Sequence, residues 1–354
     1  MSRFLIPAFL VSAFSSAILT VLVRNISLKN NFRSIPSEDR YNPHSIALGG
    51  GIAIIISILI SFAIFFPLAN AFNPELLIIS LLAVFLFAAG LADDIKSLTP
   101  MQKLIFQIIA AGLAAFFAGG RVELFIESRL ITAVMSIFWI VLLINSFNFL
   151  DNMDGASAGI AIIVSAVLGS ASYISGDLEN AIFAAVLCGT LSGFLIFNFP
   201  PAKIFMGDAG SLVIGFLIAL LTLRITYYNE TSAIDSRAAV FVPLIAVAVP
   251  LYDFISVTLL RISQGRSPFL GDTQHFSHRL KRRGLSDSQA ALTLYLATIC
   301  TGLGAVFLSR ATLIQAGVIF TQTLMILGII AILEKNNKIE NTGINGSEKK
   351  EKDK

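Results

Sequence analysis

Two carboxylates interrupt the apolar sequence near its middle, in the segment NSFNFLDNMDG at 145–155. A bare carboxylate at the centre of a bilayer costs about 2.5 kcal/mol or more, so Asp151 and Asp154 between two apolar runs imply a function. Their spacing predicts that they share one face of a helical turn at a helix start. Gly155 allows a sharp turn or a close approach to a ligand.

A second acidic pair, Asp93 and Asp94, ends another apolar run. Acids at a helix C-terminus meet the negative end of the helix dipole, which costs from a few tenths to about 1 kcal/mol. Two adjacent acids therefore call for a cation nearby. Two interpretations stay open: a solvated acid pair in a loop, or a metal site or base beside a phosphate.

The segment NFPPAKIFMGDAGS at 198–211 holds two prolines, two glycines, one base and one acid. Glycines before a helix N-terminus can present free backbone N–H groups to a phosphate. Lys203 would add a positive charge, and Asp208 is a hard oxygen ligand of the kind that Mg²⁺ accepts beside substrate phosphates. The alternative is a capped helix start with Asp208 as an ordinary first-turn acid, which the density of special residues disfavours.

Two of the three histidines, His275 and His278, are three residues apart and predict one helical face. A zinc site lacks a third ligand such as Cys nearby. We favour hydrogen bonds and charge for a diphosphate, with Arg279 contributing.

Other polar residues carry weaker signals. Asp253 lies within an apolar run and is either functional or part of a helix–helix hydrogen bond. Arg40, His44 and the glycines at 49–51 form a further set, in which the glycines suit a closely packed helix start.

The composition places these residues in a membrane protein. The chain has 354 residues, of which 56% are hydrophobic and 13% charged, with a mean hydropathy of +0.82. Soluble proteins carry about 25% charged residues, so we expect an all-α, polytopic membrane protein. Cys188 and Cys300 lie in apolar runs and predict neither a disulfide nor a metal site. The net charge of +3 says little by itself, and we expect no nucleic-acid partner.

About eleven apolar runs predict transmembrane helices. They are Phe4–Val23, Ile46–Leu68, Leu76–Ala92, Leu104–Ala118, Leu130–Ile144, Ala156–Ile174, Ala181–Phe197, Leu212–Leu223, Ala239–Leu260, Ala290–Leu308 and Thr312–Leu333. The fourth, fifth and eighth runs are short, and we expect them to extend into their flanks.

The distribution of Lys and Arg predicts the orientation. Most of them follow odd-numbered runs or lie in the C-terminal tail, which puts the N-terminus outside and the tail in the cytoplasm. The polar segments then open on one cytoplasmic face as a single composite site. We therefore expect a transmembrane domain at 1–333, with active-site loops at 24–45, 93–103, 145–155, 198–211 and 261–289, and a disordered cytoplasmic tail at 334–354.

Acids beside Lys, Arg and His suit phosphoryl chemistry, in which a protein positions groups and neutralises charge. The sequence resembles the polyprenyl-phosphate N-acetylhexosamine-1-phosphate transferases of glycosyltransferase family 4. Four ordered motifs carry the resemblance: Asp93–Asp94 with Lys103, Asn145 to Gly155, Pro201 to Ser211, and His275 to Leu280. Ser277 stands where the family often has a histidine, and the first loop is shorter than usual, which leaves the roles of Arg40 and His44 open.

The resemblance implies roles for individual residues. Asp208 would be the main Mg²⁺ ligand, with Mn²⁺ as an alternative metal. The catalytic set would be Asp93, Asp94, Lys103 and Asp151, with one of the first two handling the lipid phosphate or acting as a base. The donor would be held by Asn148, Asp154, Asn198, Lys203, Phe205, His275, His278 and Arg279, with Phe205 stacking on uracil.

The implied reaction moves a sugar-1-phosphate, GlcNAc-1-phosphate above others, from a UDP-sugar to undecaprenyl or another polyprenyl phosphate. The triple-histidine motif of phospho-MurNAc-pentapeptide translocase is absent, which favours the branch that starts O-antigen, teichoic-acid or similar glycans. The implied place is a bacterial cytoplasmic membrane, and a homodimer stays open. A one-step route and a covalent aspartyl-phosphate are both compatible with these residues. The rival hypothesis is an ion-coupled transporter that uses the acids as an ion path.

Overall fold

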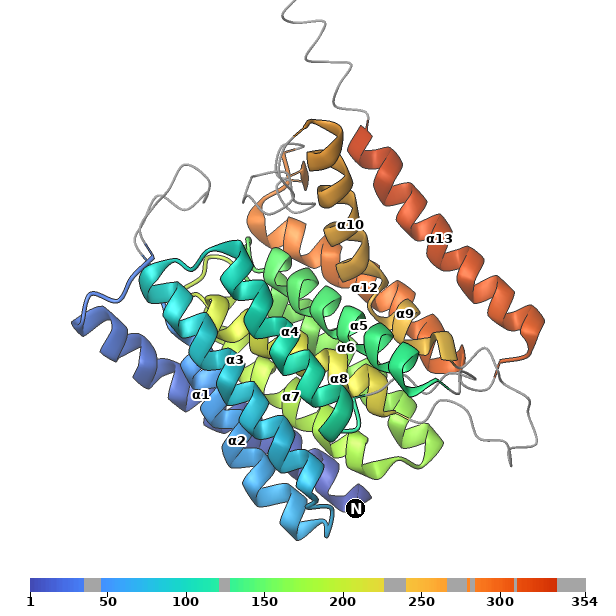
Figure 1. Cartoon of the computed structure of the whole chain (residues 1–354). Coiled ribbons are helices and arrows are strands. Elements are labelled where there is room, and N and C mark those ends of the chain that lie inside the picture. The colour runs from blue at the N-terminus through green and yellow to red at the C-terminus, as the bar shows by residue number, and fades with distance from the viewer. Residues whose placement is uncertain are drawn as a thin grey trace, which may run out of the picture.

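The computed structural model describes residues 1–34, 46–120, 128–225, 240–265, 279–280, 284–308 and 311–335. The elements in these ranges are helices (Figure 1). Nine of the described helices are long and apolar enough to cross a membrane. The predicted all-α, polytopic membrane protein is thereby confirmed.

Each predicted apolar run overlaps a helix. The helices are η1 (Ser2–Phe4), α1 (Leu5–Lys29), α2 (Gly50–Leu68), α3 (Pro74–Lys96), α4 (Pro100–Phe117), α5 (Arg129–Leu150), α6 (Ala156–Ser175), α7 (Leu178–Asn198), α8 (Asp208–Arg224), α9 (Val242–Ala246), α10 (Ala248–Ser263), α12 (Asp287–Leu308) and α13 (Leu313–Lys335). The end of α13 takes in the first two residues of the predicted tail, and 336–354 lie outside the described residues.

The short runs extend into their flanks as expected, and so do others. The predicted loops 24–45, 93–103 and 145–155 were drawn too wide, because α1, α3 and α5 continue into them. A polar side chain at the end of a bundle leaves the backbone hydrogen bonds of a helix intact, so polarity alone does not end it. Capping does: Thr99 and Gln102 form a capping box around Pro100 at the first position of α4.

The ninth predicted run, Ala239–Leu260, is two helices rather than one. α9 ends at Ala246 and α10 begins at Ala248. Pro250 has no N–H to donate to the carbonyl of Ala246, and its ring would clash with that carbonyl in a continuous helix. The break therefore falls where this proline requires it.

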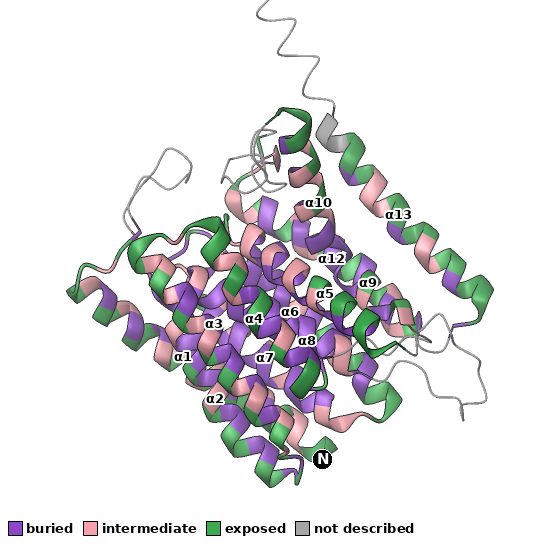
Figure 2. Ribbon diagram, viewed as in Figure 1, coloured by how far each residue is buried: buried purple, intermediate pink, exposed green. Residues whose placement is uncertain are grey.

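α8 is the central helix of the bundle. Its residues from Ala209 to Thr222 are buried, and α2, α3, α5, α6 and α7 pack around it (Figures 1 and 2). A helix that is apolar on all sides favours this position. Small residues allow close approach: a Cβ added at Gly90 would lie 2.4 Å from the carbonyl oxygen of Asp208, and one at Gly215 would lie 2.6 Å from Cα of Ile144.

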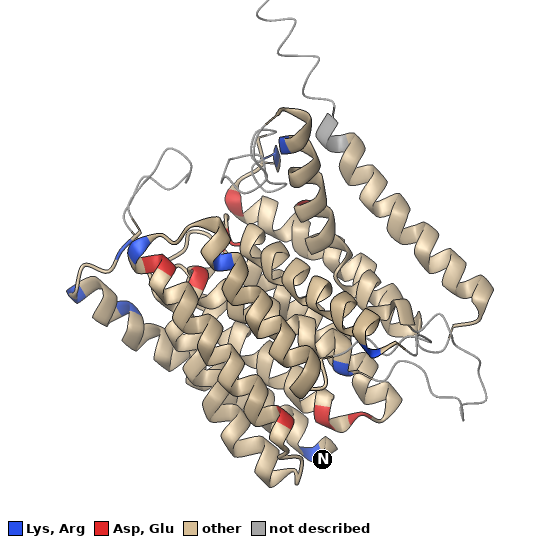
Figure 3. Ribbon diagram, viewed as in Figure 1, with Lys and Arg blue, Asp and Glu red and all other residues tan. Residues whose placement is uncertain are grey.

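Among the described residues, most charged side chains gather at the two ends of the bundle (Figure 3). At the end where α8 finishes, Arg224 donates from Nη1 to Glu75 on α3 (2.5 Å) and from Nη2 to Glu179 on α7 (2.9 Å). Its Nη1 also donates to the carbonyl oxygen of Ala118 (2.9 Å). This Arg224 cluster joins α3, α7, α8 and the end of α4. Sequence patterns did not indicate it, because its charged members lie at the ends of three separate helices.

We expect Arg224→Met to lower the free energy of unfolding in detergent by about 2 kcal/mol, because the change leaves partly buried carboxylates without their charged donor. Thermal unfolding followed by circular dichroism measures the effect. Arg129→Met is the matched control, since Arg129 is an exposed arginine that begins α5 at the same end of the bundle. Equal unfolding midpoints for the two variants would contradict the role of the cluster.

Candidate active site

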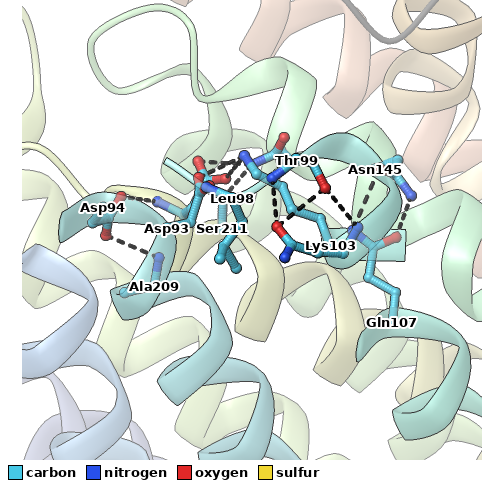
Figure 4. Close-up of polar contacts among 12 residues, drawn as sticks. Asp93, Asp94, Leu98, Thr99, Lys103, Gln107, Asn145, Ala209 and Ser211 are labelled. Carbon is cyan, nitrogen blue, oxygen red and sulfur yellow. Dashed lines mark hydrogen bonds and ion pairs between the residues drawn. The ribbon is translucent and has the colours of Figure 1, made fainter. Parts of the chain in front are cut away.

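Lys103 lies between carboxylates from two other helices. Its Nζ is 2.5 Å from Oδ2 of Asp93, near the end of α3, and 2.7 Å from Oδ2 of Asp208, the first residue of α8 (Figure 4). The side chains stay partly exposed, at 28% for Lys103 and 18% for Asp208. Lys103 is thus the cation that the acids at the end of α3 required.

Asp208 is also held from α5. Asn148 donates from Nδ2 to Oδ1 of Asp208 (3.2 Å) and to Oγ of Ser211 (2.9 Å). The structure places Asn148 on the predicted metal ligand, and its predicted contact with the substrate stays a prediction. Asp208 is therefore bonded through both of its carboxylate oxygens.

The donor set suits a hard divalent cation that the substrate helps to hold. One ammonium faces two carboxylates, which leaves a net negative charge. No group of three or more His, Cys, Asp or Glu side chains able to hold a metal occurs in the described ranges. Mg²⁺ commonly takes one or two protein carboxylates and completes its shell with phosphate oxygens and water, so Asp208 and Asp93 fit the protein's half of such a site.

Asp94 has a different environment from Asp93. Its Oδ1 accepts the backbone N–H of Asp208 (2.9 Å) and its Oδ2 that of Ala209 (3.1 Å), which caps α8 from α3 (Figure 4). Gly207, at φ +71°, permits this contact, since a Cβ there would lie 2.5 Å from Oδ2 of Asp94. Both oxygens of this predicted catalytic acid are thus occupied by helix capping.

Four backbone amides at the start of α8 are bonded within the protein. Asp94 accepts those of Asp208 and Ala209, while the carbonyl of Gly207 accepts those of Gly210 and Ser211. The start of α8 is thus capped, and Asp208 is the acid of its first turn, as the capped-helix alternative predicted. The cap comes from another helix, which sequence spacing does not reveal.

The glycines at 49–51 bind the same segment. Gly50 and Gly51 donate their N–H groups to the carbonyls of Phe205 and Met206, both at 2.9 Å. The N–H of Phe205 donates to the carbonyl of Ala47 at 2.9 Å. The predicted closely packed start of α2 is confirmed, and the backbone of Phe205 is held in place. Its side chain is half-buried, and its stacking on uracil stays a prediction.

Asp151 and Asp154 do not share a helical turn. Asp151 follows the end of α5 as its C-cap, and Asp154 lies in the turn before α6. Gly155 takes φ +72° and interrupts the helical path, so α6 begins only at Ala156. Asp154 accepts the N–H of Ala202 through Oδ2 (2.9 Å) and so joins this turn to the loop after α7. The described contacts of Lys103 do not include Asp151.

Asn198, the last residue of α7, also joins the turn before α6 to the loop after α7. It is 2% exposed, accepts the N–H of Gly155 through Oδ1 (3.1 Å) and donates from Nδ2 to the carbonyl of Ile204 (2.9 Å). Its predicted contact with uridine is untested. The hydroxyl of Tyr295 on α12 donates to the carbonyl of Gly155 at 2.7 Å. Sequence patterns gave no sign of Tyr295, because its partner lies far away in the chain.

Two more predicted site residues, Lys203 and Arg279, fall within the described ranges. Lys203 is exposed. His275 and His278, like Arg40 and His44, lie outside the described residues. Arg279 donates from Nη2 to Oγ of Ser256 (2.8 Å) and lies 4.0 Å from Oδ1 of Asp253, which is 1% exposed. Asp253 is thus close to a cation.

Arg261, in the last turn of α10, is a buried charge. It is 2% exposed, and its guanidinium lies 4.9 Å from the centroid of the Phe149 ring. A guanidinium over an aromatic face is a favourable cation–π contact, and it packs α10 against the end of α5.

The fold and the site define a polytopic helical membrane protein with a polar centre of two carboxylates and a lysine at one end of its bundle. The model of the family described as glycosyl transferase family 4 matches residues 76–226, which include this centre. Over these residues the chain is similar to this family.

Similar proteins extend the match over most of the chain. A probable undecaprenyl-phosphate N-acetylglucosaminyl 1-phosphate transferase from Bacillus subtilis is 28% identical over 87% of this chain and 86% of its own length. An undecaprenyl-phosphate alpha-N-acetylglucosaminyl 1-phosphate transferase from Yersinia pestis is 28% identical over 92% and 89%. A decaprenyl-phosphate N-acetylglucosaminephosphotransferase from Mycolicibacterium smegmatis is 30% identical over 70% and 65%.

We expect Asp94→Ala to lower the free energy of unfolding by about 1–2 kcal/mol, because it leaves two partly buried N–H groups of α8 without an acceptor. Asp94→Asn should cost less, since its amide oxygen still accepts one of them. Thermal unfolding in detergent measures both, with Asp93→Ala as the control that leaves the cap intact. An Asp94→Ala protein as stable as the unmodified one would refute the capping role.

Proposed function

We propose that this protein transfers N-acetylglucosamine-1-phosphate from UDP-N-acetylglucosamine to undecaprenyl phosphate or a similar polyprenyl phosphate and releases UMP. The names of the similar proteins support the sugar and the lipid acceptor. The observation that carries the proposal is the Lys103 ammonium between Asp93 and Asp208 at the start of the central helix. The product would begin a cell-surface glycan.

In the proposed reaction, a phosphate oxygen of the lipid attacks the donor phosphorus that carries the sugar. A new diphosphate bond forms, the bond from that phosphorus to the oxygen shared with UMP breaks, and UMP leaves with this oxygen. Asp208 and Asp93 would hold Mg²⁺, or Mn²⁺ in its place, and this ion would offset negative charge on the diphosphate oxygens.

The contributions of the chain itself follow from its contacts. Lys103 reduces the repulsion between the two carboxylates and keeps them at one place. Asn148 holds the other oxygen of Asp208 and so restricts its rotation. Asp93 and Asp208 are bound by an ammonium and Asp94 by two amides. These contacts favour direct attack by the lipid over an aspartyl-phosphate intermediate.

The proposal includes a position in the membrane. α8, α9 and α10 are each shorter than the nine clear candidates. We propose that α8 crosses as one span and α9 and α10 together as another, which completes eleven spans. The N-terminus would then lie outside, and the site would open on the cytoplasmic face of a bacterial cytoplasmic membrane. There a water-soluble donor and a membrane-bound acceptor can meet. His275, His278 and Arg279 would approach the donor from the segment after α10.

The rival transporter hypothesis has little support. None of the similar proteins reported above is named a transporter. An ion path would place acids near the middle of the spans, whereas the described acids gather mainly at the ends of the bundle (Figure 3).

A transfer assay tests the proposal directly. Purified protein in detergent receives undecaprenyl phosphate, Mg²⁺ and one UDP-sugar from a panel, and UMP release is recorded. We expect release with UDP-N-acetylglucosamine that requires both the lipid and the metal. Release without the lipid would indicate hydrolysis, and no release with any donor from folded protein would overturn the transferase assignment.

Asp208→Asn should lower turnover by about 10²–10³-fold, the effect of removing one preorganised charged group from a reaction centre. The control is Ser170→Ala, an exposed residue on α6 whose hydroxyl bonds only within its own helix. Near-normal turnover by Asp208→Asn in saturating Mg²⁺ would refute its role as the metal ligand.

A further inference from the structure

A pair of amide side chains lies one helical turn deeper in the bundle than the site. Gln107 follows Lys103 by one turn of α4, and Asn145 precedes Asn148 by nearly one turn of α5. At about 1.5 Å per residue, the pair lies roughly 4.5–6 Å farther from the end of the bundle. Each helix therefore presents one residue that bonds Asp208 and, beneath it, one member of the pair.

The two amides bond to each other. Asn145 donates from Nδ2 to Oε1 of Gln107 at 2.7 Å, and Gln107 donates from Nε2 to Oδ1 of Asn145 at 3.5 Å (Figure 4). Gln107 is 2% exposed. Nδ2 of Asn145 also donates to the carbonyl of Val141 at 2.8 Å, which fixes the orientation of its amide.

The placement of the pair gives it a consequence for the site. α4 packs against α3 and α5, and its Lys103 reaches Asp208 across the gap to α8. Rotation or sliding of α4 against α5 would separate Gln107 from Asn145. Because a buried amide without a partner is costly, the pair opposes this movement. The same movement would shift Lys103 relative to Asn148, and both of these hold Asp208.

We infer that Gln107 and Asn145 are positioning residues for the transfer reaction: their mutual hydrogen bonds align α4 with α5, so that Lys103 and Asn148 hold Asp208 in the geometry that binds the metal. This inference rests on the proposed function. Neither amide touches the carboxylates of Asp93 or Asp208 in the described contacts, so the pair acts through Lys103 and Asn148. One of the motifs that carry the family resemblance contains Asn145, but none of them contains Gln107.

The test is a double-mutant cycle with a swap. Gln107→Leu and Asn145→Leu should each lower kcat by about tenfold and raise the Mg²⁺ concentration for half-maximal rate by a similar factor, with the KM for the UDP-sugar nearly unchanged. The double Leu variant should be no worse than either single one, because each change already breaks the pair. The swap of Gln107→Asn with Asn145→Gln keeps one long and one short amide and should recover kcat to within about threefold.

Trp139→Phe provides the matched control. It removes another hydrogen bond between helices, from Nε1 of Trp139 on α5 to Oγ1 of Thr222 on α8 (2.8 Å), deeper in the bundle. We expect it to lower the unfolding midpoint in detergent while kcat and the Mg²⁺ requirement stay near those of the unmodified protein. Equal losses of activity in Trp139→Phe and the pair variants would mean that the pair only stabilises the fold, and would overturn the inference.

Other outcomes separate the remaining possibilities. Additive losses in the double variant would refute the pair, and a raised KM that the swap does not repair would make Asn145 a direct substrate contact. A second measurement needs no turnover: Mg²⁺ alone should raise the unfolding midpoint of the unmodified protein, and do so less in the Leu variants. If the unmodified protein transfers nothing, the proposed function fails, while this measurement still decides the pair.

Discussion

The start of a fully buried helix imposes the main constraint on this structure. The first N–H groups of α8 have no partners within the helix, and in an apolar bundle each must find one. Asp94 accepts two of them and Gly207 the next two. The helix dipole favours acid at this end, so the place that needs a capping carboxylate also tolerates Asp208. The site is built on this cap.

The same capping contact joins secondary structure to chemistry. α3 must lie close enough for Asp94 to reach the start of α8, which Gly90 and Gly207 permit. The adjacent Asp93 then meets Lys103, and Lys103 meets Asp208. Two neighbouring acids thus do different work: one satisfies backbone amides, and the other belongs to the charged centre. At the far end of both helices, Arg224 on α8 bonds Glu75 on α3, so the pair of helices is joined at each end.

Much of the fold was predictable because membrane helices depend on local properties. Long apolar runs predicted the helices, but the break between α9 and α10 before Pro250 was not predicted. The boundaries were less predictable, since a polar residue such as Asn148 continues α5 when its side chain finds a partner beyond the helix. The turn at 151–155 was misread because a positive φ at Gly155 outweighed the helical spacing of its acids.

By itself, the sequence determined the class of protein, the residue types of the site and the end of the bundle at which they gather. Those properties follow from composition and from the position of each polar segment along the chain. Only the tertiary structure decided which acid faces Lys103, which one caps α8, and that Asn198, Tyr295 and Gln107 support the surrounding loops and helices. The reason is physical: a hydrogen-bond partner is set by the approach of two helices or loops distant in the chain, and their approach depends on the packing of the whole bundle.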